Sequence, residues 1–340
     1  MDRCNIAVIG ATGAVGKIFL QILEERQFPV DQVRLCASKR SWGKTLNVNL
    51  REVMIEEVTP KLLSEVDITF IAAGSDISHQ VAPLAVEQGS FVVDKSSAFR
   101  MDPTVPLVVP EVNGSDIGSH SGIVSTPNCS TTELVMALKP LDDANRINRV
   151  VVDTYQSVSG TGAAAVEELQ AQSIQVLAGE STHPSQYPHQ IAFNVLPHIE
   201  TFLPNGYTTE EMKMVDETRK IMHRPNLRIS ATCARVPVRV AHSEAVHIEF
   251  SNPITPPEIR DLLLVAPGIK VLDHPGDAVY PMPINVEGRD PVYVGRIRQD
   301  VSHPAGIAMW LASDNLRKGA ALNAIQIAED VLDKNLLTGK

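Results

Sequence analysis

Cys129 stands in the segment "STPNCSTTEL" (residues 125–134), where a turn leads into a helix-like stretch. A thiol in such a position is either a small buried hydrophobic side chain or a nucleophile whose thiolate is stabilised by amides at the helix N-terminus. Free cysteine is among the most buried residue types, so the segment taken alone favours the first interpretation. The rest of the chain has to decide between the two.

A second candidate site is the glycine-rich turn near the start of the chain. The segment "NIAVIG" (5–10) predicts a strand, "GATGAVG" (10–16) a turn and "KIFLQILEE" (17–25) a helix. The glycines give GxxGxxG, a variant of the dinucleotide fingerprint in which backbone amides and a helix N-terminus hold a pyrophosphate. A glycine pattern alone is weak evidence, but the strand–turn–helix context favours a nucleotide site over a mere tight turn.

The end of the second predicted strand indicates which nucleotide binds. The segment "QVRLCAS" (32–38) predicts this strand, and Lys39, Arg40 and Ser41 follow it. An acidic side chain here would bind the ribose 2′-hydroxyl of NAD, whereas hydroxyls and cations suit the 2′-phosphate of NADP. The sequence therefore favours NADP; the alternative is that Lys39 and Arg40 lie in a solvated loop.

A cysteine beside a nicotinamide cofactor indicates oxidation or reduction at an acyl carbon. A thiolate adds to an aldehyde to give a thiohemiacetal, hydride loss leaves a thioester, and a second nucleophile opens the thioester. This chemistry needs a base near the sulfur, donors for the oxyanion and groups that bind the substrate.

The order of the predicted elements places these residues in two domains. Apolar segments at 66–74 and 90–97, with a helix-like segment at 77–89 between them, continue a strand–helix alternation typical of a parallel, doubly wound sheet. From about residue 147 the pattern changes.

Long, alternating, β-branched segments at 147–160, 226–240 and 244–251 predict a second domain of α+β type, with an antiparallel sheet exposed to solvent on one face. The last segment, 314–337, has helical periodicity, and we expect it to pack on the first domain.

Composition excludes several other classes of protein. The 340 residues are 44% hydrophobic with a net charge of −10 and no long basic run, which argues against a nucleic-acid partner. Neither a signal peptide nor a run of 18 apolar residues is visible, so we expect a cytoplasmic protein without a membrane partner. Widely spaced cysteines and histidines predict neither disulfides nor a metal site.

Segments spread over most of the chain resemble the aspartate-semialdehyde dehydrogenase family. They are "GATGAVG", "DKSSAFR", "PLVVPEVN", "PNCSTTEL", "TYQSVSGTG", "QIAFNVLPHI", "EEMKM", "CARVPVRVAHSEAVHIE", "VGRIR" and "DNLRKGAALNAIQIAE". The resemblance implies an α/β fold like that of glyceraldehyde-3-phosphate dehydrogenase. A Rossmann-like NADP domain would span 1–128, completed by a C-terminal helix at 315–340, and an α+β catalytic, substrate and dimerisation domain would span 129–314.

The same resemblance implies an activity and an assembly. The activity is NADPH-dependent reductive dephosphorylation of L-aspartyl 4-phosphate to L-aspartate 4-semialdehyde, a step toward lysine, diaminopimelate, methionine, threonine and isoleucine. The assembly is a homodimer or a dimer of dimers, and the small-molecule partners are the substrate and inorganic phosphate.

Site residues carry over one by one. The resemblance makes Cys129 the acyl-thioester nucleophile, His242 the general acid/base and Gln156 a residue that orients the substrate. Arg235 resembles the arginine that pairs with the substrate carboxylate, a task that suits a planar, two-pronged guanidinium.

The remaining candidates bind phosphate, substrate or cofactor. Arg100 and Lys213 resemble the phosphate-site cations, Glu210 the carboxylate that meets the substrate ammonium, and Asn128 a further substrate contact. The positions that match the family's NADP contacts are Gly10, Thr12, Gly13, Ala14, Val15, Arg40, Ser41, Ser159, Gly160 and Asn315.

Structural interpretations compete at several of these positions. Glu211, three residues after Thr208, fits a helix capping box, and Glu210 could equally be a first-turn acid that favours the helix dipole. Arg235 and His242 are seven residues apart, which in an unbroken strand places them on opposite faces. Pro237 between them could mark an irregularity that resolves this conflict.

Two rival functions stay open. N-acetyl-glutamyl-phosphate reductase performs the same chemistry on a substrate one methylene longer. A non-catalytic paralogue could act as a binding protein, but it would be expected to have lost its nucleophile, and Cys129 is present together with Gln156, Arg235 and His242.

Overall fold

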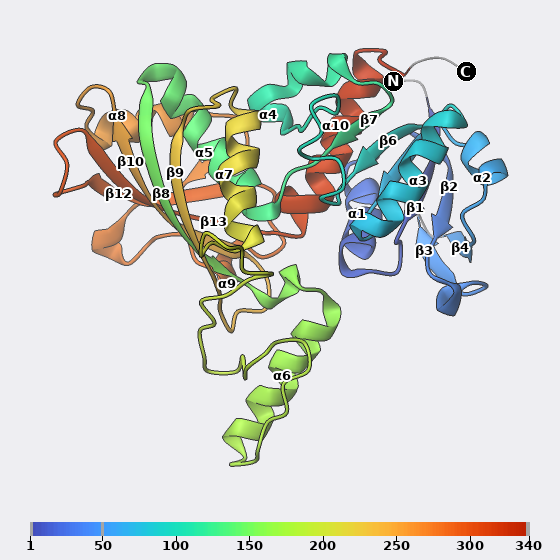
Figure 1. The fold of residues 1–340 in the computed structure, drawn as a ribbon, viewed down its shortest axis with the longest axis horizontal. Helices are drawn as coiled ribbons and strands as arrows, with labels where there is room; N and C mark the ends of the chain where they lie inside the picture. Colours follow the sequence, from blue (N-terminus) through green and yellow to red (C-terminus); the bar gives the residue numbers. More distant parts are fainter. Residues whose placement is uncertain (1–2, 49–50, 338–340) are drawn as a thin grey trace. The chain divides into compact units, whose positions relative to one another are not determined.

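The computed structural model describes residues 3–48 and 51–337, and the chain divides into two compact units (Figure 1). The first unit comprises Met1–Pro127 and Ala320–Lys340, and the second comprises Asn128–Gly319.

The first unit is built on a seven-stranded sheet in the order β3-β4-β2-β1-β5-β6-β7. Its strands are β1 (Cys4–Ile9), β2 (Val30–Cys36), β3 (Thr45–Val48), β4 (Arg51–Glu56), β5 (Ile68–Ile71), β6 (Phe91–Asp94) and β7 (Ile123–Ser125). All neighbours pair in parallel except β3 with β4, which pair antiparallel. The predicted parallel, doubly wound sheet is confirmed.

Helices cover both faces of this sheet because its central strands are apolar on both sides. On one face α1 (Ala14–Glu25) and α10 (Leu322–Asp333) enclose a core in which the rings of Phe19 and Phe70 lie 4.4 Å apart. On the other face α2 (Pro60–Ser64) and α3 (Ser75–Glu87) bury leucine, valine and alanine side chains. The short helix α4 (Pro110–Asn113) contacts α10.

The second unit is built on a six-stranded sheet in the order β11-β12-β13-β10-β8-β9. Its strands are β8 (Ile147–Gln156), β9 (Arg228–Arg235), β10 (His242–Phe250), β11 (Ile269–Val271), β12 (Val292–Gln299) and β13 (Gly306–Ser313). The expectation of an antiparallel sheet is wrong for β8 with β9 and for β11 with β12, which pair in parallel. In both cases helix-containing connections return the chain to the same end of the sheet.

Helices α5 (Cys129–Ala144), α7 (Thr209–Ile221) and α8 (Pro256–Leu264) pack on one face of this sheet. Helix α6 (Ala163–Leu177) extends away from the sheet (Figure 1) and packs against residues 187–196 with a small core of its own. The short helix α9 (Pro283–Val286) contacts β13. Within the described residues, no helix is both long and apolar enough to span a membrane.

Candidate active site

Cys129 is the first residue of α5, as the sequence predicted for a helix start. Asn128 is the N-cap residue, and its Oδ1 accepts hydrogen bonds from the backbone N–H of Ser130 at 3.0 Å and of Thr131 at 3.4 Å. Cys129 is partly exposed, whereas the other three cysteines are buried. Burial raises the pKa of Cys4 and of Cys36 to about 12. The chain thus offers one accessible thiol, at a helix N-terminus.

Gly319 lies directly against the thiol residue. A Cβ atom at Gly319 would come within 2.9 Å of the Cys129 Cβ, closer than real Cβ contacts allow. Gly319 belongs to a π-helical turn, Arg317–Ala321, of a kind often found at functional sites. Only glycine leaves room for Cys129 at this position.

His242 contacts the thiol of Cys129. The Nε2 atom of His242 lies 3.2 Å from the Cys129 Sγ, and the side chain is fully buried. Burial lowers the pKa of His242 to about 4; the positive charge of Arg235 adds to this, and the nearby carboxylates, Glu133 first, oppose it. The ring is therefore neutral near pH 7 and can take up a proton.

Ser157, which sequence reasoning missed, holds the other nitrogen of the His242 ring. The backbone N–H and the Oγ of Ser157 both lie 3.1 Å from Nδ1. The N–H can donate to an unprotonated Nδ1, and the Oγ can accept from a protonated one. Both neutral tautomers and the protonated ring therefore find a partner at Ser157.

Ala241 turns the chain into His242. It has a φ of +74°, a left-handed conformation that is strained for a residue with a side chain. Its N–H donates to the Asn315 Oδ1 at 2.9 Å, and this oxygen also faces the hydroxyls of Ser157 and Ser159. These contacts stabilise the turn and so fix where β10 begins.

The sequence-based conflict between Arg235 and His242 is resolved by the break at Pro237. β9 ends at Arg235 and β10 begins at His242, so the two residues stand on different strands and their spacing does not decide their faces. β8 runs between these strands, and its last residue, Gln156, pairs with Arg235. The ends of the three strands bring all three side chains to one end of the sheet.

Arg235 is a buried cation. Its Nη1 donates to the backbone oxygen of Ser157 at 2.7 Å, and its exposed fraction is 6%. Among the described residues, no carboxylate lies within ion-pair distance of it. A Cβ at Gly160 would come within 3.0 Å of Nη1 and 3.3 Å of the His242 ring, so Gly160 allows the chain to pass close to both.

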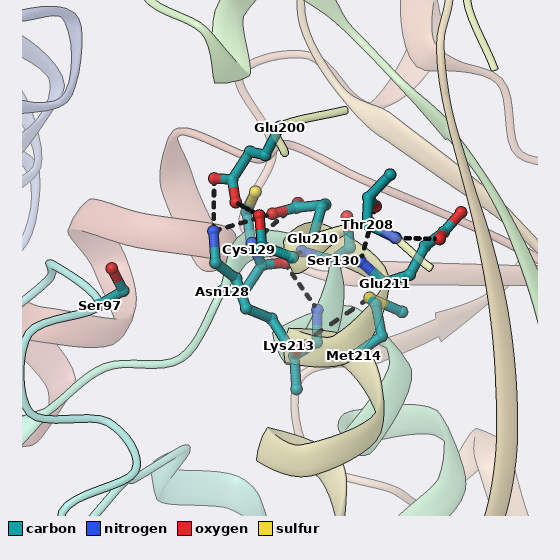
Figure 2. A network of polar contacts seen from close by, with 12 residues as sticks. Ser97, Asn128, Cys129, Ser130, Glu200, Thr208, Glu210, Glu211, Lys213 and Met214 are labelled. Atoms are coloured by element: carbon teal, nitrogen blue, oxygen red, sulfur yellow. Dashed lines mark hydrogen bonds and ion pairs between the residues drawn. The ribbon is translucent and has the colours of Figure 1, made fainter. Parts of the chain in front are cut away.

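Glu210 connects several of the predicted substrate residues (Figure 2). Its Oε1 accepts hydrogen bonds from Asn128 Nδ2 at 2.9 Å and Gln156 Nε2 at 3.1 Å, and its Oε2 lies 3.2 Å from Lys213 Nζ. Burial alone would raise the pKa of Glu210, but Lys213 and the two amide donors outweigh it and lower the pKa. Glu210 is therefore an ionised carboxylate that holds Asn128, Gln156 and Lys213 in place.

Helix α7 presents both members of the predicted Glu210–Lys213 face, and Lys213 also pairs with Glu200 at 2.5 Å. The capping box at its start is confirmed, since Thr208 Oγ1 accepts from the N–H of Glu211 and the Glu211 carboxylate accepts from the N–H of Thr208. Glu211 also accepts from the N–H of Cys233 at 3.0 Å, a structural role.

The first unit holds the glycine turn. Gly10 has a φ of +87°, and a Cβ there would come within 2.5 Å of the Ala72 oxygen. A Cβ at Gly16 would come within 2.5 Å of the Gly10 oxygen, whereas one at Gly13 would make only an ordinary 3.4 Å contact with that atom. The fold therefore requires Gly10 and Gly16, but it does not require Gly13.

The other predicted cofactor and phosphate residues are distributed over both units. Thr12 lies in the turn, Ala14 and Val15 begin α1, and Arg40 and Ser41 lie in a short 3-10 turn after β2. Arg100 is buried in the first unit, where Nη2 donates to the Lys95 oxygen at 2.8 Å. Ser159, Gly160 and Asn315 belong to the second unit. Their roles in binding NADP or phosphate stay predictions.

Sequence reasoning overlooked the residues that support this cluster. They are Glu133, Ser157, Glu217, Ala241, Glu244, Ser313 and Gly319. Glu217, for example, accepts a hydrogen bond from the N–H of Asn128 at 2.6 Å. The one available signal was the glycine of "DNLRKGAAL", which the resemblance included but did not single out. Among the described residues, no group of histidine, cysteine, aspartate or glutamate side chains could hold a metal ion.

Comparisons with known proteins show the family. Residues 5–120 match the family model for the NAD binding domain of semialdehyde dehydrogenase, and residues 138–318 match the model for its dimerisation domain. An aspartate-semialdehyde dehydrogenase of Aquifex aeolicus is 50% identical over 337 residues, which are 98% of this chain and 99% of that protein.

Solved structures show the same similarity. Aspartate semialdehyde dehydrogenase II of Vibrio cholerae, solved as a complex with ASA, is 45% identical with a TM-score of 0.95, over 98% of this chain and 99% of that one. The Candida albicans enzyme, solved with NADP, is 26% identical with a TM-score of 0.78, over 98% of this chain and all of that one.

Proposed function

Because the chain belongs to the aspartate-semialdehyde dehydrogenase family, we propose that it catalyses the NADPH-dependent reductive dephosphorylation of L-aspartyl 4-phosphate to L-aspartate 4-semialdehyde. One observation carries this proposal: at a helix start, the Cys129 Sγ lies 3.2 Å from the Nε2 of a buried, neutral His242. This is the arrangement of an activated nucleophile and its base.

Cys129 begins the reaction. The Ser157 N–H donates to Nδ1 while that nitrogen is unprotonated; when the ring proton moves to Nδ1 and is donated to the Ser157 Oγ, the Nε2 lone pair of His242 faces the thiol and can accept its proton. The thiolate attacks the acyl phosphate, the carbon–sulfur bond forms, and the bond from carbon to the phosphate oxygen breaks. Inorganic phosphate leaves, and an acyl thioester on Cys129 remains.

His242 completes the reaction as an acid. When bound, NADPH supplies the hydride that reduces the thioester carbon. The protonated ring of His242 can then give its Nε2 proton to the substrate oxygen, which completes a thiohemiacetal on Cys129. When the thiohemiacetal collapses, the carbon–sulfur bond breaks, the hydroxyl proton returns to the His242 Nε2, and the aldehyde and the thiolate are released. The Ser157 Oγ can accept from Nδ1 throughout, so the ring keeps its orientation while its charge changes.

Arg235 and the Glu210 cluster would bind the amino-acid end of the substrate. A buried arginine without a carboxylate partner suits the substrate α-carboxylate, which would complete a two-pronged ion pair. Glu210, kept ionised by its donors, suits the α-ammonium. Gln156 donates Nε2 to Glu210, and its Oε1 accepts no hydrogen bond from the described residues, which leaves this oxygen for the substrate.

The residues of the glycine turn fit NADP. Gly13 is the N-cap of α1 and has no side chain with which to cap it, so the first amides of that helix can bind a pyrophosphate. Arg40 is exposed beside Ser38 and Ser41, as a 2′-phosphate site would require. Arg100 and Lys213 would bind inorganic phosphate; Lys213 already neutralises two carboxylates, so its contribution should be the smaller.

We also propose a homodimer, because residues 138–318 match the dimerisation-domain model. Tyr155 alternates with the inward residues of β8 and therefore lies on the sheet face opposite α5. The residue is 39% exposed, and its ring lies 5.2 Å from that of Trp310. A second copy would cover this face. Light scattering should show a dimer that Tyr155→Arg disrupts and that Val301→Arg, on an exposed loop, leaves intact.

The deciding experiment is phosphate-dependent reduction of NADP with L-aspartate 4-semialdehyde. We expect turnover only when both NADP and phosphate are present. The same assay with N-acetyl-glutamate 5-semialdehyde, one methylene longer, tests the rival reductase. The comparisons do not favour that rival, and preference for its substrate would contradict the proposal.

A further inference from the structure

Two carboxyl groups lie beneath the Cys129–His242 pair. Glu133 is four residues after Cys129 on α5, and Glu244 is two residues after His242 on β10. These spacings keep each carboxyl on the same face as its neighbour and advance by similar distances, roughly 6–7 Å. Glu133 and Glu244 are therefore arranged relative to each other much as Cys129 and His242 are, but farther along α5 and β10.

The carboxyl pair has too few donors for two negative charges. Glu133 is 1% exposed and Glu244 is fully buried. Ser313 Oγ donates to the Glu133 Oε2 at 2.6 Å, but Glu133 Oε1 and both oxygens of Glu244 accept no hydrogen bond from any described donor. Among the described residues, no lysine or arginine forms an ion pair with either group. An unpaired buried carboxylate is strongly destabilising.

A shared proton removes this cost. Each of the two groups alters the pKa of the other, so they lie close together, and two facing carboxyl groups can form a hydrogen bond only with a proton on one of them. Burial raises the pKa of both carboxyls, and the charge of Glu133 raises the pKa of Glu244 further. Ser313 stabilises charge on Glu133, so the proton belongs on Glu244.

We propose that Glu133 and Glu244 hold one proton between them, as a carboxylate and a carboxylic acid, and that their single negative charge stabilises the protonated form of His242. They are positioning residues: they act through His242 and do not touch the substrate. The inference deepens the proposed function and rests on the acid–base role assigned to His242.

The surroundings of His242 show why this charge matters. Charged and titratable groups face the ring from α5, α7, the end of β9 and the residue after β13: Cys129, Glu133, Glu210, Arg235 and Asp314. Burial and Arg235 oppose protonation of the ring, and the carboxylates favour it, Glu133 most strongly. Cys233 on β9 faces Glu244, and burial raises its pKa, so it stays a neutral thiol.

Matched amide substitutions separate charge from structure. Glu133→Gln removes the negative charge, because Glu244 then stays a neutral acid. Glu244→Gln keeps the charge on Glu133 and still supplies an N–H donor for it. The two variants are equal in size and in chemical change, so a purely structural role predicts equal effects.

The first measurement is the pH dependence of Cys129 alkylation by iodoacetamide, without substrate or cofactor. Removing a nearby negative charge favours loss of a proton from the Cys129 thiol and from the His242 ring. Glu133→Gln should therefore shift the midpoint of the alkylation rate to lower pH by about one unit. The acid limb of the kcat/KM profile, which reports His242, should shift in the same direction by a similar amount. Glu244→Gln should move neither by more than a few tenths of a unit. Equal shifts in both variants, or none in Glu133→Gln, would overturn the proposal.

The second measurement is the infrared band of a protonated carboxyl group. Wild-type protein at pH 8 should show this band, and Glu244→Gln should lose it. A band that is absent, or that survives in Glu244→Gln, overturns the proposal even if Glu133→Gln fails to fold. Neither alkylation nor infrared absorption depends on the substrate. Loss of turnover with aspartate semialdehyde alone would therefore contradict the proposed function and not the shared proton.

Discussion

The glycine turn of the first unit and the Cys129–His242 cluster of the second are assembled in opposite ways. The turn is seven consecutive residues, 10–16, and its donors are backbone amides at the start of α1. The cluster takes its side chains from five elements, α5, α7, β8, β9 and β10. A backbone site depends on local conformation, whereas a side-chain site depends on the register of a whole sheet. Substitutions in the two regions should therefore have different effects on turnover, stability and NADP binding.

The largest effect is expected at the centre of the cluster. Cys129→Ser should abolish nearly all turnover and leave a folded protein that still binds NADP, because a hydroxyl at this position supplies little nucleophile. Steady-state kinetics would measure turnover, and titration with NADPH, followed by its fluorescence, would measure cofactor binding. Cys233→Ser is the matched control: that thiol is buried, and we expect it to keep most of the activity. Substantial turnover by Cys129→Ser would contradict the thioester mechanism.

Arg235→Lys should have the next largest effect. The lysine keeps the charge but loses the two-pronged geometry and the bond to the Ser157 oxygen, so we expect kcat/KM to fall by about 10²-fold. A substrate analogue without the α-carboxylate should already have a low kcat/KM with the wild-type enzyme. Its kcat/KM should fall little further in Arg235→Lys. If kcat/KM falls by the same factor for the substrate and for the analogue, Arg235 acts on His242 or the fold and not on the substrate carboxylate.

The contrast between the regions also explains what the sequence could predict. The strand–turn–helix at residues 4–25 is a local pattern, and the structure has it nearly as expected. The roles of Ser157 and Ala241 around His242 could not be predicted, because they depend on how β8, β9 and β10 pair in the sheet. A serine after a strand carries no signal of the histidine that it contacts. The parallel pairing of β8 with β9 was missed for a similar reason, since alternation along a strand does not report the direction of its neighbour.

Glycine substitutions test the turn itself. Gly10→Ala should destabilise the first unit strongly, because the new Cβ meets the Ala72 oxygen and the φ is positive. Gly13→Ala should leave the melting temperature nearly unchanged and weaken NADP binding by about tenfold or more, because only the ligand needs close approach there. Calorimetry with and without NADP separates the two outcomes. Equal losses of stability in both variants would mean that Gly13 serves the fold.

Acid stability should report His242. Its folded pKa is lowered to about 4 by burial, so the unfolded chain takes up this proton first as the pH falls. The stability that comes from the neutral ring is present above about pH 6.5 and is lost between there and pH 4. We therefore expect His242→Gln to lose less melting temperature than wild type between pH 7 and pH 5. His183→Gln, at an exposed histidine, should behave like wild type. Identical acid sensitivity in all three proteins would contradict a neutral, buried His242.

The smallest effect is expected at Arg40. Its exposed guanidinium lies in the 3-10 turn after β2, and the solvated-loop interpretation predicts that its removal changes nothing. If it binds the 2′-phosphate, Arg40→Ala should raise the KM for NADP by several-fold to about tenfold and leave that for NAD nearly unchanged, because only NADP carries that group. The effect should shrink at high salt, since an exposed ion pair is screened. Lys44→Ala, a nearby exposed cation outside the turn, is the control for general charge. A similar rise for both nucleotides in Arg40→Ala would assign the residue to the loop and not to NADP selectivity.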